Sequence, residues 1–268
     1  WPLQEPAYGR TIADLEVTDR VVCYPSSTRL FKPIGQINCK ISLLMLEPWA
    51  IQRRYYSMLW LLRYQFDSIL CRYRELSRRY ANIHHFEAVE SWVNVNALKP
   101  SYIKTKICSI IASAKNRLDG HQLRHQVVEQ IQIRHLPVDI LGYGYAPFNN
   151  KEEGLLPYQY SVIIENVQES DYYSEKLLDC ILCGTLPVFW GAPNIADYFD
   201  PRGMVICVNG EEIITALSSL NPTISHEVKE AMESNRQKAI QLANLNERIG
   251  RFFAAIEDID EYHSSHIS

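Results

Sequence analysis

Two apolar segments separated by a short helical one lie between residues 158 and 191. Residues 160–164 read Tyr-Ser-Val-Ile-Ile, and residues 186–190 read Leu-Pro-Val-Phe-Trp. Runs of this length suit strands that are buried on both faces. The sequence from Glu175 to Cys183 suits a helix, so the segment predicts a β-α-β unit. Parallel strands joined by a helix are typical of layered α/β folds, and this restricts the chain to that class.

The predicted helix begins with Glu175 and Lys176. A positive charge in the first helical turn opposes the helix dipole and costs about 0.3 kcal/mol or more. Folding alone does not explain a lysine there, whereas a phosphate bound at the helix N-terminus does. Because the helix start and the end of the preceding strand face one crevice, the unit predicts a nucleotide or nucleotide-sugar site.

Strands and helices are expected to alternate over the rest of the chain as well. Before residue 100, the sequence predicts strands near 20–24, 39–46, 67–71 and 86–95 and helices near 49–66 and 73–80. The first of these helices would bury a face that contains Ile51, Tyr55, Met58, Leu59 and Leu62.

A linker with Lys99-Pro100 separates this part from a second alternating series. Strands are expected near 106–113, 138–142, 160–164, 186–190 and 204–208, and helices near 120–133, 177–183, 211–220, 226–243 and 246–259. We therefore predict an α/β fold with two lobes, residues 1–98 and 99–268.

Composition and charge exclude several classes of protein. The net charge of -4 and the pI near 6.1 give no reason to expect nucleic-acid binding. No run of about 20 apolar residues is present, so no membrane span is expected. The seven cysteines are odd in number and lie in apolar surroundings, which favours a reducing, cytoplasmic compartment. Peripheral attachment to a membrane stays open, because an anchor upstream of Trp1 would be invisible here.

Two local features have a structural and a functional interpretation. Cys180-x-x-Cys183 could be a redox or metal motif, but the second cysteine pair of a structural zinc site is missing, and core packing is favoured. Residues 53–80 are rich in arginine and tyrosine. The favoured interpretation is that they form the solvated faces of helices, and the alternative is a binding patch.

The second lobe resembles a known family. The run Tyr158-Gln-Tyr160-Ser-Val-Ile-Ile-Glu165-Asn166, followed by Tyr172-Tyr-Ser-Glu175-Lys176, is similar to the signature of the alpha-1,3-fucosyltransferases of glycosyltransferase family ten. That signature is a Tyr-Lys-Phe strand, then Phe-Glu-Asn, then Tyr-Val-Thr-Glu-Lys. Gly184-Thr-Leu-Pro-Val-Phe-Trp-Gly-Ala-Pro193 and Tyr198-Phe199-Asp200-Pro201 continue the likeness, notably to bacterial members. The dense match covers about 50 residues, whereas residues 1–95 match weakly.

The resemblance implies a GT-B glycosyltransferase architecture of two Rossmann-like lobes, with a C-terminal helix that packs back on the first lobe. It also implies that the donor is held by the C-terminal lobe and the acceptor lies on the side of the N-terminal lobe. It implies inverting transfer of fucose from GDP-fucose to an oligosaccharide hydroxyl, without a metal ion or another cofactor. Arg124 and Lys176 would meet the diphosphate, and Glu175 the ribose or the sugar. The donor-binding positions that correspond to the family are Ser113, Arg124, Glu165, Asn166, Tyr172, Glu175 and Lys176.

The resemblance also implies an acidic catalytic base in a turn that follows a strand of the first lobe. Glu47, in Leu46-Glu47-Pro48, is the corresponding residue in this chain. A base near the acceptor hydroxyl and positive charge near the departing diphosphate are what the chemistry requires. Other acidic residues of the first lobe, and His84, His85, Glu87 and Glu90, stay open as alternative bases.

Metal-dependent transfer is the less favoured mechanism. Asp258-Ile-Asp260 is the one Asp-x-Asp sequence, and it lies in the expected last helix rather than after a strand. His121 and His125 are one helical turn apart, but no third ligand is evident, so they are interpreted as polar residues near Arg124. Two alternatives for the whole chain remain: the same fold with another nucleotide-sugar donor, and a non-catalytic protein that binds nucleotide sugars or glycans.

Overall fold

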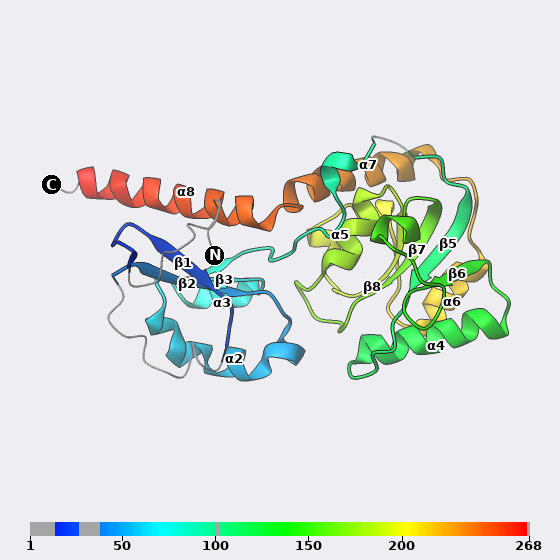
Figure 1. Ribbon diagram of the computed structural model, residues 1–268, viewed down its shortest axis with the longest axis horizontal. Coiled ribbons are helices and arrows are strands. Elements are labelled where there is room, and N and C mark those ends of the chain that lie inside the picture. The colour runs from blue at the N-terminus through cyan, green and yellow to red at the C-terminus, as the bar shows by residue number, and fades with distance from the viewer. Residues whose placement is uncertain (1–13, 27–37, 100–101, 267–268) are drawn as a thin grey trace. The chain divides into compact units, whose positions relative to one another are not determined.

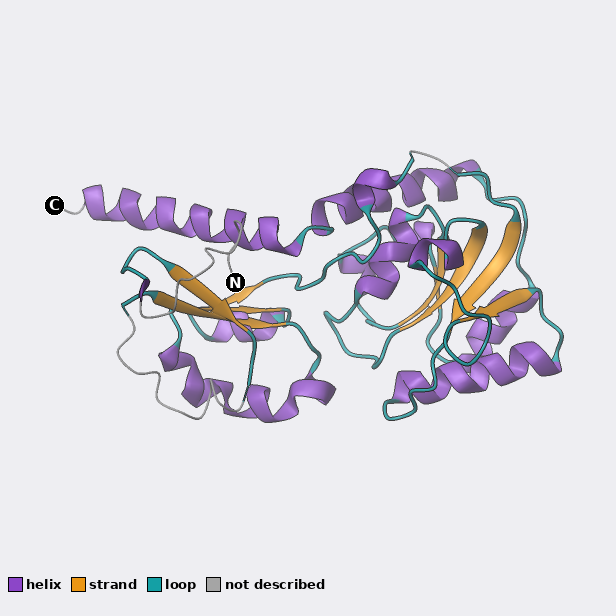
Figure 2. Cartoon of the chain, in the orientation of Figure 1, coloured by secondary structure: helices purple, strands orange, loops and turns teal. Residues whose placement is uncertain are grey.

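The computed structural model describes residues 14–26, 38–99 and 102–266, with side chains described as far as residue 257. The chain divides into two compact units, one of residues 1–88 and 244–268 and the other of residues 89–243. Each unit is built on one parallel sheet with helices on both faces, which confirms the α/β prediction (Figures 1 and 2). The side chains of Asp258 and Asp260, named above as a metal motif, lie outside the described residues.

The first unit has a four-stranded sheet in the order β1-β2-β3-β4. Its strands are β1 (Arg20–Cys23), β2 (Lys40–Met45), β3 (Ser68–Cys71) and β4 (Ile83–His85), all parallel. Helices α2 (Trp49–Leu62) and α3 (Arg74–Arg79) cover one face, and α8 (Leu245–His266) covers the other (Figure 1).

The alternation of side chains along β2 explains this layering. Leu43 and Met45 point into the cluster with α2, whereas Leu44 packs with Leu245 and Phe253 of α8. Side chains of a strand alternate between the faces of its sheet, so a strand that is apolar throughout needs cover on both. The C-terminal helix therefore packs on the first unit, as predicted.

Two expectations for the first unit are wrong. Residues 86–95 do not form a strand, and the fourth strand is instead the shorter β4 that precedes them. In α2 the buried residues are Tyr56, Leu59 and Leu62, while Ile51 is exposed. Gln52 has non-helical φ and ψ angles, so the helix is kinked there and its first residues leave the expected face.

The second unit has a five-stranded parallel sheet in the order β6-β5-β7-β8-β9. The strands are β5 (Lys106–Ile111), β6 (Val138–Leu141), β7 (Tyr158–Ile164), β8 (Leu186–Trp190) and β9 (Val205–Ile206). The helices are α4 (Asp119–Ile133), α5 (Glu175–Leu182), α6 (Gly210–Ser218) and α7 (His226–Leu242). Short 3-10 turns occupy several of the connections.

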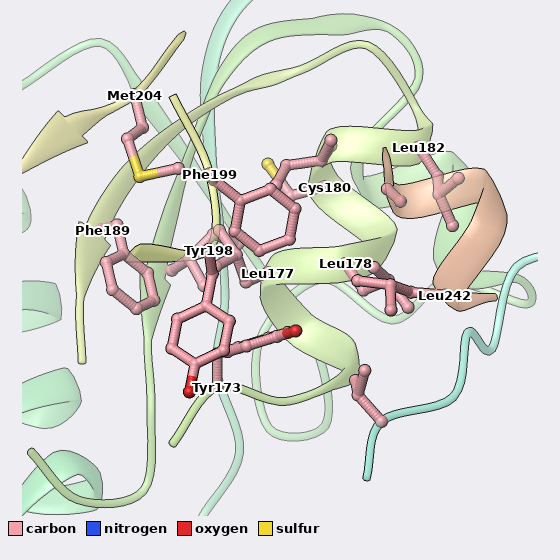
Figure 3. Close-up of a cluster of buried hydrophobic side chains, with 14 of the residues drawn as sticks. Tyr173, Leu177, Leu178, Cys180, Leu182, Phe189, Tyr198, Phe199, Met204 and Leu242 are labelled. Carbon is pink, nitrogen blue, oxygen red and sulfur yellow. The ribbon is translucent and has the colours of Figure 1, made fainter. Parts of the chain in front are cut away.

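Strand β7 is buried on both faces by different helices. Tyr160, Val162 and Ile164 pack with α4 and α6, whereas Ile163 faces the cluster around α5 and α7. Figure 3 shows this second cluster, in which Leu178 and Leu182 of α5 lie on the side of Leu242 of α7. Cys180 and Cys183 belong to the same cluster, as core packing predicts. Helix α5 is thus fixed to the sheet along its length.

The units differ from the division at residues 98 and 99 that the sequence suggested. Residues 89–98 belong to the second unit because Asp179, a fully buried residue of α5, holds them. Its Oδ1 accepts hydrogen bonds from the Ser91 hydroxyl (2.9 Å) and the Trp92 amide (3.0 Å), and Lys151 is 2.6 Å from its Oδ2. Residues 244–268 belong to the first unit. Within the described part of the chain, no helix is long and apolar enough to cross a bilayer.

Candidate donor-binding site

A buried carboxylate, that of Glu165, lies directly after the carboxyl end of β7. Glu165 follows the last strand residue, its side chain is 0% exposed, and its amide donates to the Trp190 carbonyl (2.9 Å). The Ser174 amide donates to its Oε1 (2.8 Å), and the Ser174 hydroxyl donates to its Oε2 (2.7 Å). Full burial leaves Glu165 no surface for a ligand. It acts on the site through the residues that it holds.

Ser174 connects this carboxylate to helix α5. It is the N-cap residue, and its hydroxyl oxygen accepts a hydrogen bond from the Lys176 amide (3.3 Å). Serine is among the preferred N-cap residues because its oxygen satisfies a backbone donor of the first turn. One short side chain therefore sets both the start of α5 and the orientation of Glu165.

Lys176 lies between two carboxylates. Its ammonium is 3.1 Å from Glu175 Oε1 and 3.7 Å from Glu165 Oε2, and its side chain is 26% exposed. Burial lowers the pKa of Lys176, but Glu165 and Glu175 outweigh burial and the pKa is raised. These ion pairs offset the unfavourable helix dipole, so the argument that folding alone does not explain this lysine is wrong. The partial exposure still leaves the ammonium accessible to an anion.

Glu175 is affected by the same pairs in the opposite sense. Burial raises the pKa of its carboxyl group, but the positive charges of Lys176 and Lys151 lower it by more, so the pKa is below the ordinary value. Both residues are therefore charged at neutral pH. The cation of the site is preorganised by neighbours on its own element and by Glu165 on the strand.

Helix α4 begins against the same strand end. A Cβ atom on Gly120 would lie 1.7 Å from the Glu165 carbonyl oxygen, so this position requires glycine. The Gly120 amide donates to the Asn166 carbonyl (3.0 Å). This close approach brings the first turn of α4 to the carboxyl edge of the sheet, where open α/β sheets bind ligands.

Arg124 lies one turn further along α4 and is 7% exposed. Its Nη2 donates to the Ile164 carbonyl at the end of β7 (2.5 Å). Burial lowers the pKa of Arg124, and Glu165, Tyr172 and Glu175 partly oppose this. The guanidinium stays charged, because arginine does not lose its proton in proteins. Its remaining donors offer the planar fork that suits phosphate oxygens.

His121 was not assigned to the donor-binding positions, but it lies among them. It is 7% exposed on the first turn of α4, and its Nδ1 accepts a weak hydrogen bond from the Leu118 amide (3.4 Å). Burial and the positive charge of Arg124 lower its pKa, although a hydrogen bond with Asn166 opposes the shift. A neutral imidazole therefore borders the two cations. Its position three residues before Arg124, on the same helical face, was the available sequence signal.

The loop from Asn166 to Tyr173 is fixed by two residues that follow β8. Asp171 has a positive φ of 63°. Its Oδ1 accepts hydrogen bonds from the Tyr198 hydroxyl (2.7 Å) and the Asn194 amide group (2.8 Å). Tyr172 is 2% exposed in this loop, and Asn166 is half-buried. These hydrogen bonds hold the loop in place at Asp171.

Ser113 and Glu47, the two remaining site residues expected from the sequence, are further from β7 along the chain. Ser113 is half-buried two residues beyond β5, at the same edge of the sheet. Glu47 belongs to the first unit and is exposed. The Tyr56 hydroxyl donates to its backbone carbonyl (3.1 Å). The seven donor-binding candidates thus belong to one unit, and the candidate base belongs to the other.

This arrangement can bind an anion between two cations and two helix N-termini. Arg124 and Lys176 are held by Ile164 and Glu165, which are consecutive residues at the end of β7. Backbone N–H groups at the starts of α4 and α5 add donors at the same edge. Among the described side chains, no three His, Cys, Asp or Glu residues are grouped so that they could hold a metal ion.

Comparison with solved structures defines the fold class. A crystal structure of alpha1,3-fucosyltransferase with GDP covers 82% of this chain and 70% of its own, with a TM-score of 0.51 and 17% identity. The structure of TarM covers 88% of this chain and 54% of its own, with a TM-score of 0.56 and 10% identity. Both are GT-B glycosyltransferase folds, and the present chain has this architecture.

The family follows from the sequence of the second unit. Residues 102–218 match the model described as glycosyltransferase family 10 (fucosyltransferase) C-term, so this part of the chain is similar to that family. The Helicobacter pylori protein alpha-(1,3)-fucosyltransferase FucT is 37% identical over 65 residues. That match covers 24% of this chain and 13% of the relative's length. Residues 102–218 contain all seven donor-binding candidates.

Proposed function

We propose that this chain is an inverting glycosyltransferase that moves fucose from GDP-fucose to a glycan hydroxyl without a metal ion. The observation that carries the proposal is the pairing of Arg124 and Lys176 at one sheet edge, inside the region that matches family 10. The structural neighbour solved with GDP supports a guanosine diphosphate donor in this fold.

The proposed reaction breaks the bond between the sugar C1 and the β-phosphate oxygen, whose electron pair leaves with GDP. The acceptor oxygen attacks C1 from the opposite side and gives its proton to a carboxylate, for which we propose Glu47. Negative charge builds on the departing diphosphate as positive charge builds on the sugar ring. Arg124, Lys176 and the helix N-termini oppose the phosphate charge, and such fixed charges are worth more in a site shielded from water.

The buried residues of the site have indirect roles in this proposal. Glu165 orients Ser174 and Lys176, and Gly120 allows α4 to approach the strand end. Asn166, Glu175 and Ser113 are proposed to contact the nucleoside or the sugar, and the buried Tyr172 to support the donor site from beside Arg124. Residues that contact the substrate and are themselves held by other side chains are already in position before the substrate binds. The site therefore has to rearrange less during the reaction.

A ligand panel followed by two variants tests the proposal. The melting temperature is measured with GDP, UDP, ADP and GDP-fucose, and the guanosine compounds are expected to raise it most. Stronger stabilisation by UDP or ADP would contradict the GDP-sugar assignment. Binding of GDP without turnover of GDP-fucose on any glycan acceptor would instead favour a non-catalytic binding protein.

Lys176→Ala is expected to weaken GDP binding by about 1–3 kcal/mol, as loss of a charge-assisted contact does. Lys229→Ala is the matched control, because Lys229 is an exposed lysine of α7. Glu47→Gln is expected to abolish turnover while GDP affinity stays unchanged. Undiminished turnover would assign the base to another residue, with His84, His85, Glu87 and Glu90 as the next candidates.

A further inference from the structure

The outer surface of α2 differs from an ordinary solvated helix face. Trp60 and Leu61 of α2 are 59% and 51% exposed, and Tyr64, in the 3-10 turn (Arg63–Gln65) that follows the helix, is 74% exposed. They follow two exposed arginines of α2, Arg53 and Arg54. The buried residues of α2 point to the opposite side, into the cluster with β2 and β3. Spacings of three, four and seven residues place the exposed side chains on one face.

The C-terminal end of α3 extends this surface. The Arg63 guanidinium lies 4.0 Å from the centre of the Tyr64 ring and 4.8 Å from that of Tyr80. The Arg79 guanidinium also lies 5.4 Å from the centre of the Tyr80 ring. The tyrosine rings are therefore interleaved with guanidinium groups. We call the surface formed by Arg53, Arg54, Trp60, Leu61, Tyr64 and Arg79 the α2–α3 face.

The charge of this region has the opposite sign to that of the chain. Helices α2 and α3, with the 3-10 turn Arg63–Gln65, contain six arginines and one acidic residue, Glu75. The whole chain has a net charge of -4. Positive charge is thus concentrated on one side of the first unit, on the outer surface of the two helices that cover that side of the sheet (Figure 1).

This combination fits the surface of an anionic bilayer. Arginines are attracted to lipid phosphate groups, tryptophan and tyrosine are favoured at the level of the headgroups, and leucine enters the acyl boundary. The exposed apolar side chains project from a helix, as insertion between lipids requires. We propose that the α2–α3 face binds the surface of a membrane that contains anionic phospholipids. The proposal does not depend on the reaction proposed above.

Sedimentation with vesicles tests this. The full chain is mixed with vesicles of phosphatidylcholine alone or with about one third phosphatidylglycerol, and it is expected to sediment mainly with the anionic vesicles, less so as salt rises. Arg53→Glu with Arg54→Glu is expected to lower the partition coefficient about tenfold or more. Trp60→Ser with Leu61→Ser is expected to lower it even at low salt, because apolar insertion is lost.

The matched control is Ile133→Ser with Arg134→Glu. These residues are also an exposed apolar side chain and an exposed arginine, but they lie at the end of α4. Their replacement is expected to leave vesicle binding unchanged. All three variants alter exposed side chains, so each should melt as the parent does, and turnover of GDP-fucose with a soluble acceptor should be unaffected.

Three results would overturn the proposal. The first is equal sedimentation of the parent with neutral and anionic vesicles. The second is vesicle binding by the α2 variants that matches the parent or the control. The third combines two observations: neither the parent nor the α2 variants bind vesicles, and light scattering shows a dimeric parent and monomeric variants. The α2–α3 face would then be a contact between two copies of the chain.

Discussion

The two units each contain a joint where a buried strand passes into a helix, and the two joints are stabilised differently. At the β7–α5 joint of the second unit, Glu165, Ser174 and Lys176 form a polar network between residues 165 and 176. At the β2–α2 joint of the first unit, Pro48 is the N-cap residue and provides no side-chain hydrogen bond. The Trp49 amide instead donates a hydrogen bond to the Tyr73 hydroxyl oxygen (2.7 Å).

Both joints contain a buried arginine that binds a carbonyl at the strand end. Arg124 donates to the Ile164 carbonyl, and Arg72 donates through Nε to the Leu46 carbonyl (3.0 Å). Arg72 also donates to the Ala88 carbonyl (3.0 Å), whereas Arg124 has the carboxylate of Glu165 as an electrostatic partner. The β7–α5 joint thus concentrates charges of both signs, most of them buried. The other uses its arginine to hold backbone and leaves Glu47 exposed.

The largest difference between the joints is expected from their glutamates. Glu165→Gln removes a buried charge that accepts two hydrogen bonds and pairs with Lys176, and we expect it to lower the free energy of unfolding by about 3 kcal/mol. Glu47→Gln is the matched control and should change it by less than about 0.5 kcal/mol, because Glu47 is exposed. Urea denaturation of both variants measures the contrast. Equal values would show that the buried network does not stabilise the second unit.

Ser174→Ala is expected to have the next largest effect. It removes an N-cap and leaves Glu165 with one donor fewer, so the free energy of unfolding should fall by about 1–2 kcal/mol. Ser174→Asn supplies a side chain that can cap the helix and should recover part of the loss. If both variants are as stable as the parent, the local cap is not what fixes the start of α5.

Tyr73→Phe tests the corresponding contact of the first unit. Loss of the hydroxyl that meets the Trp49 amide should lower the free energy of unfolding by about 1 kcal/mol, the usual contribution of one hydrogen bond. The ring itself stays in place, packed edge-on against Tyr56 (5.1 Å between centroids). A loss as large as that of Ser174→Ala would show that the two joints depend equally on their caps.

The smallest effect is expected in the acid dependence of stability. The pKa of Glu175 in the folded chain is below its ordinary value of 4.5, so the contribution of this carboxylate is present above that value and is lost as the pH falls through the lowered pKa. Glu175→Gln should therefore flatten the decline in stability between about pH 5 and pH 3, by less than about 1 kcal/mol. If the stability of parent and variant depends on pH in the same way, Lys176 does not stabilise the charged form of Glu175 over the protonated form.

Much of the site could be predicted because its elements are close in sequence. The strand 160–164 and the helix that begins at Glu175 are separated by one loop, and a run of apolar residues is enough to indicate a strand buried on both faces. The family signature then linked Arg124 to this segment, and the structure places both at one sheet edge. The roles of these residues in binding a donor stay predictions.

What failed depended on contacts between distant residues. The pairing of Lys176 with Glu165 was missed, because a linear pattern does not show that Glu165 is buried next to Ser174 and Lys176. The division of the chain near residue 98 missed the hydrogen bonds from Ser91 and Trp92 to Asp179, nearly ninety residues later. The kink at Gln52 likewise changed which face of α2 is buried.

The amino-acid sequence by itself determined the α/β class, the parallel β-α-β unit and the family signature, because these depend on local periodicity and on ordered motifs. Only the tertiary structure decided which charges pair, which helix belongs to which unit and which side chains stay exposed. Burial and long-range pairing set the pKa values and the accessibility of the site residues, and neither is a property of neighbouring residues alone. Lys176 shows both parts: its place in the first turn of a helix and its neighbour Glu175 are local, whereas its second carboxylate partner, Glu165, comes from the end of β7 and is brought close by the fold.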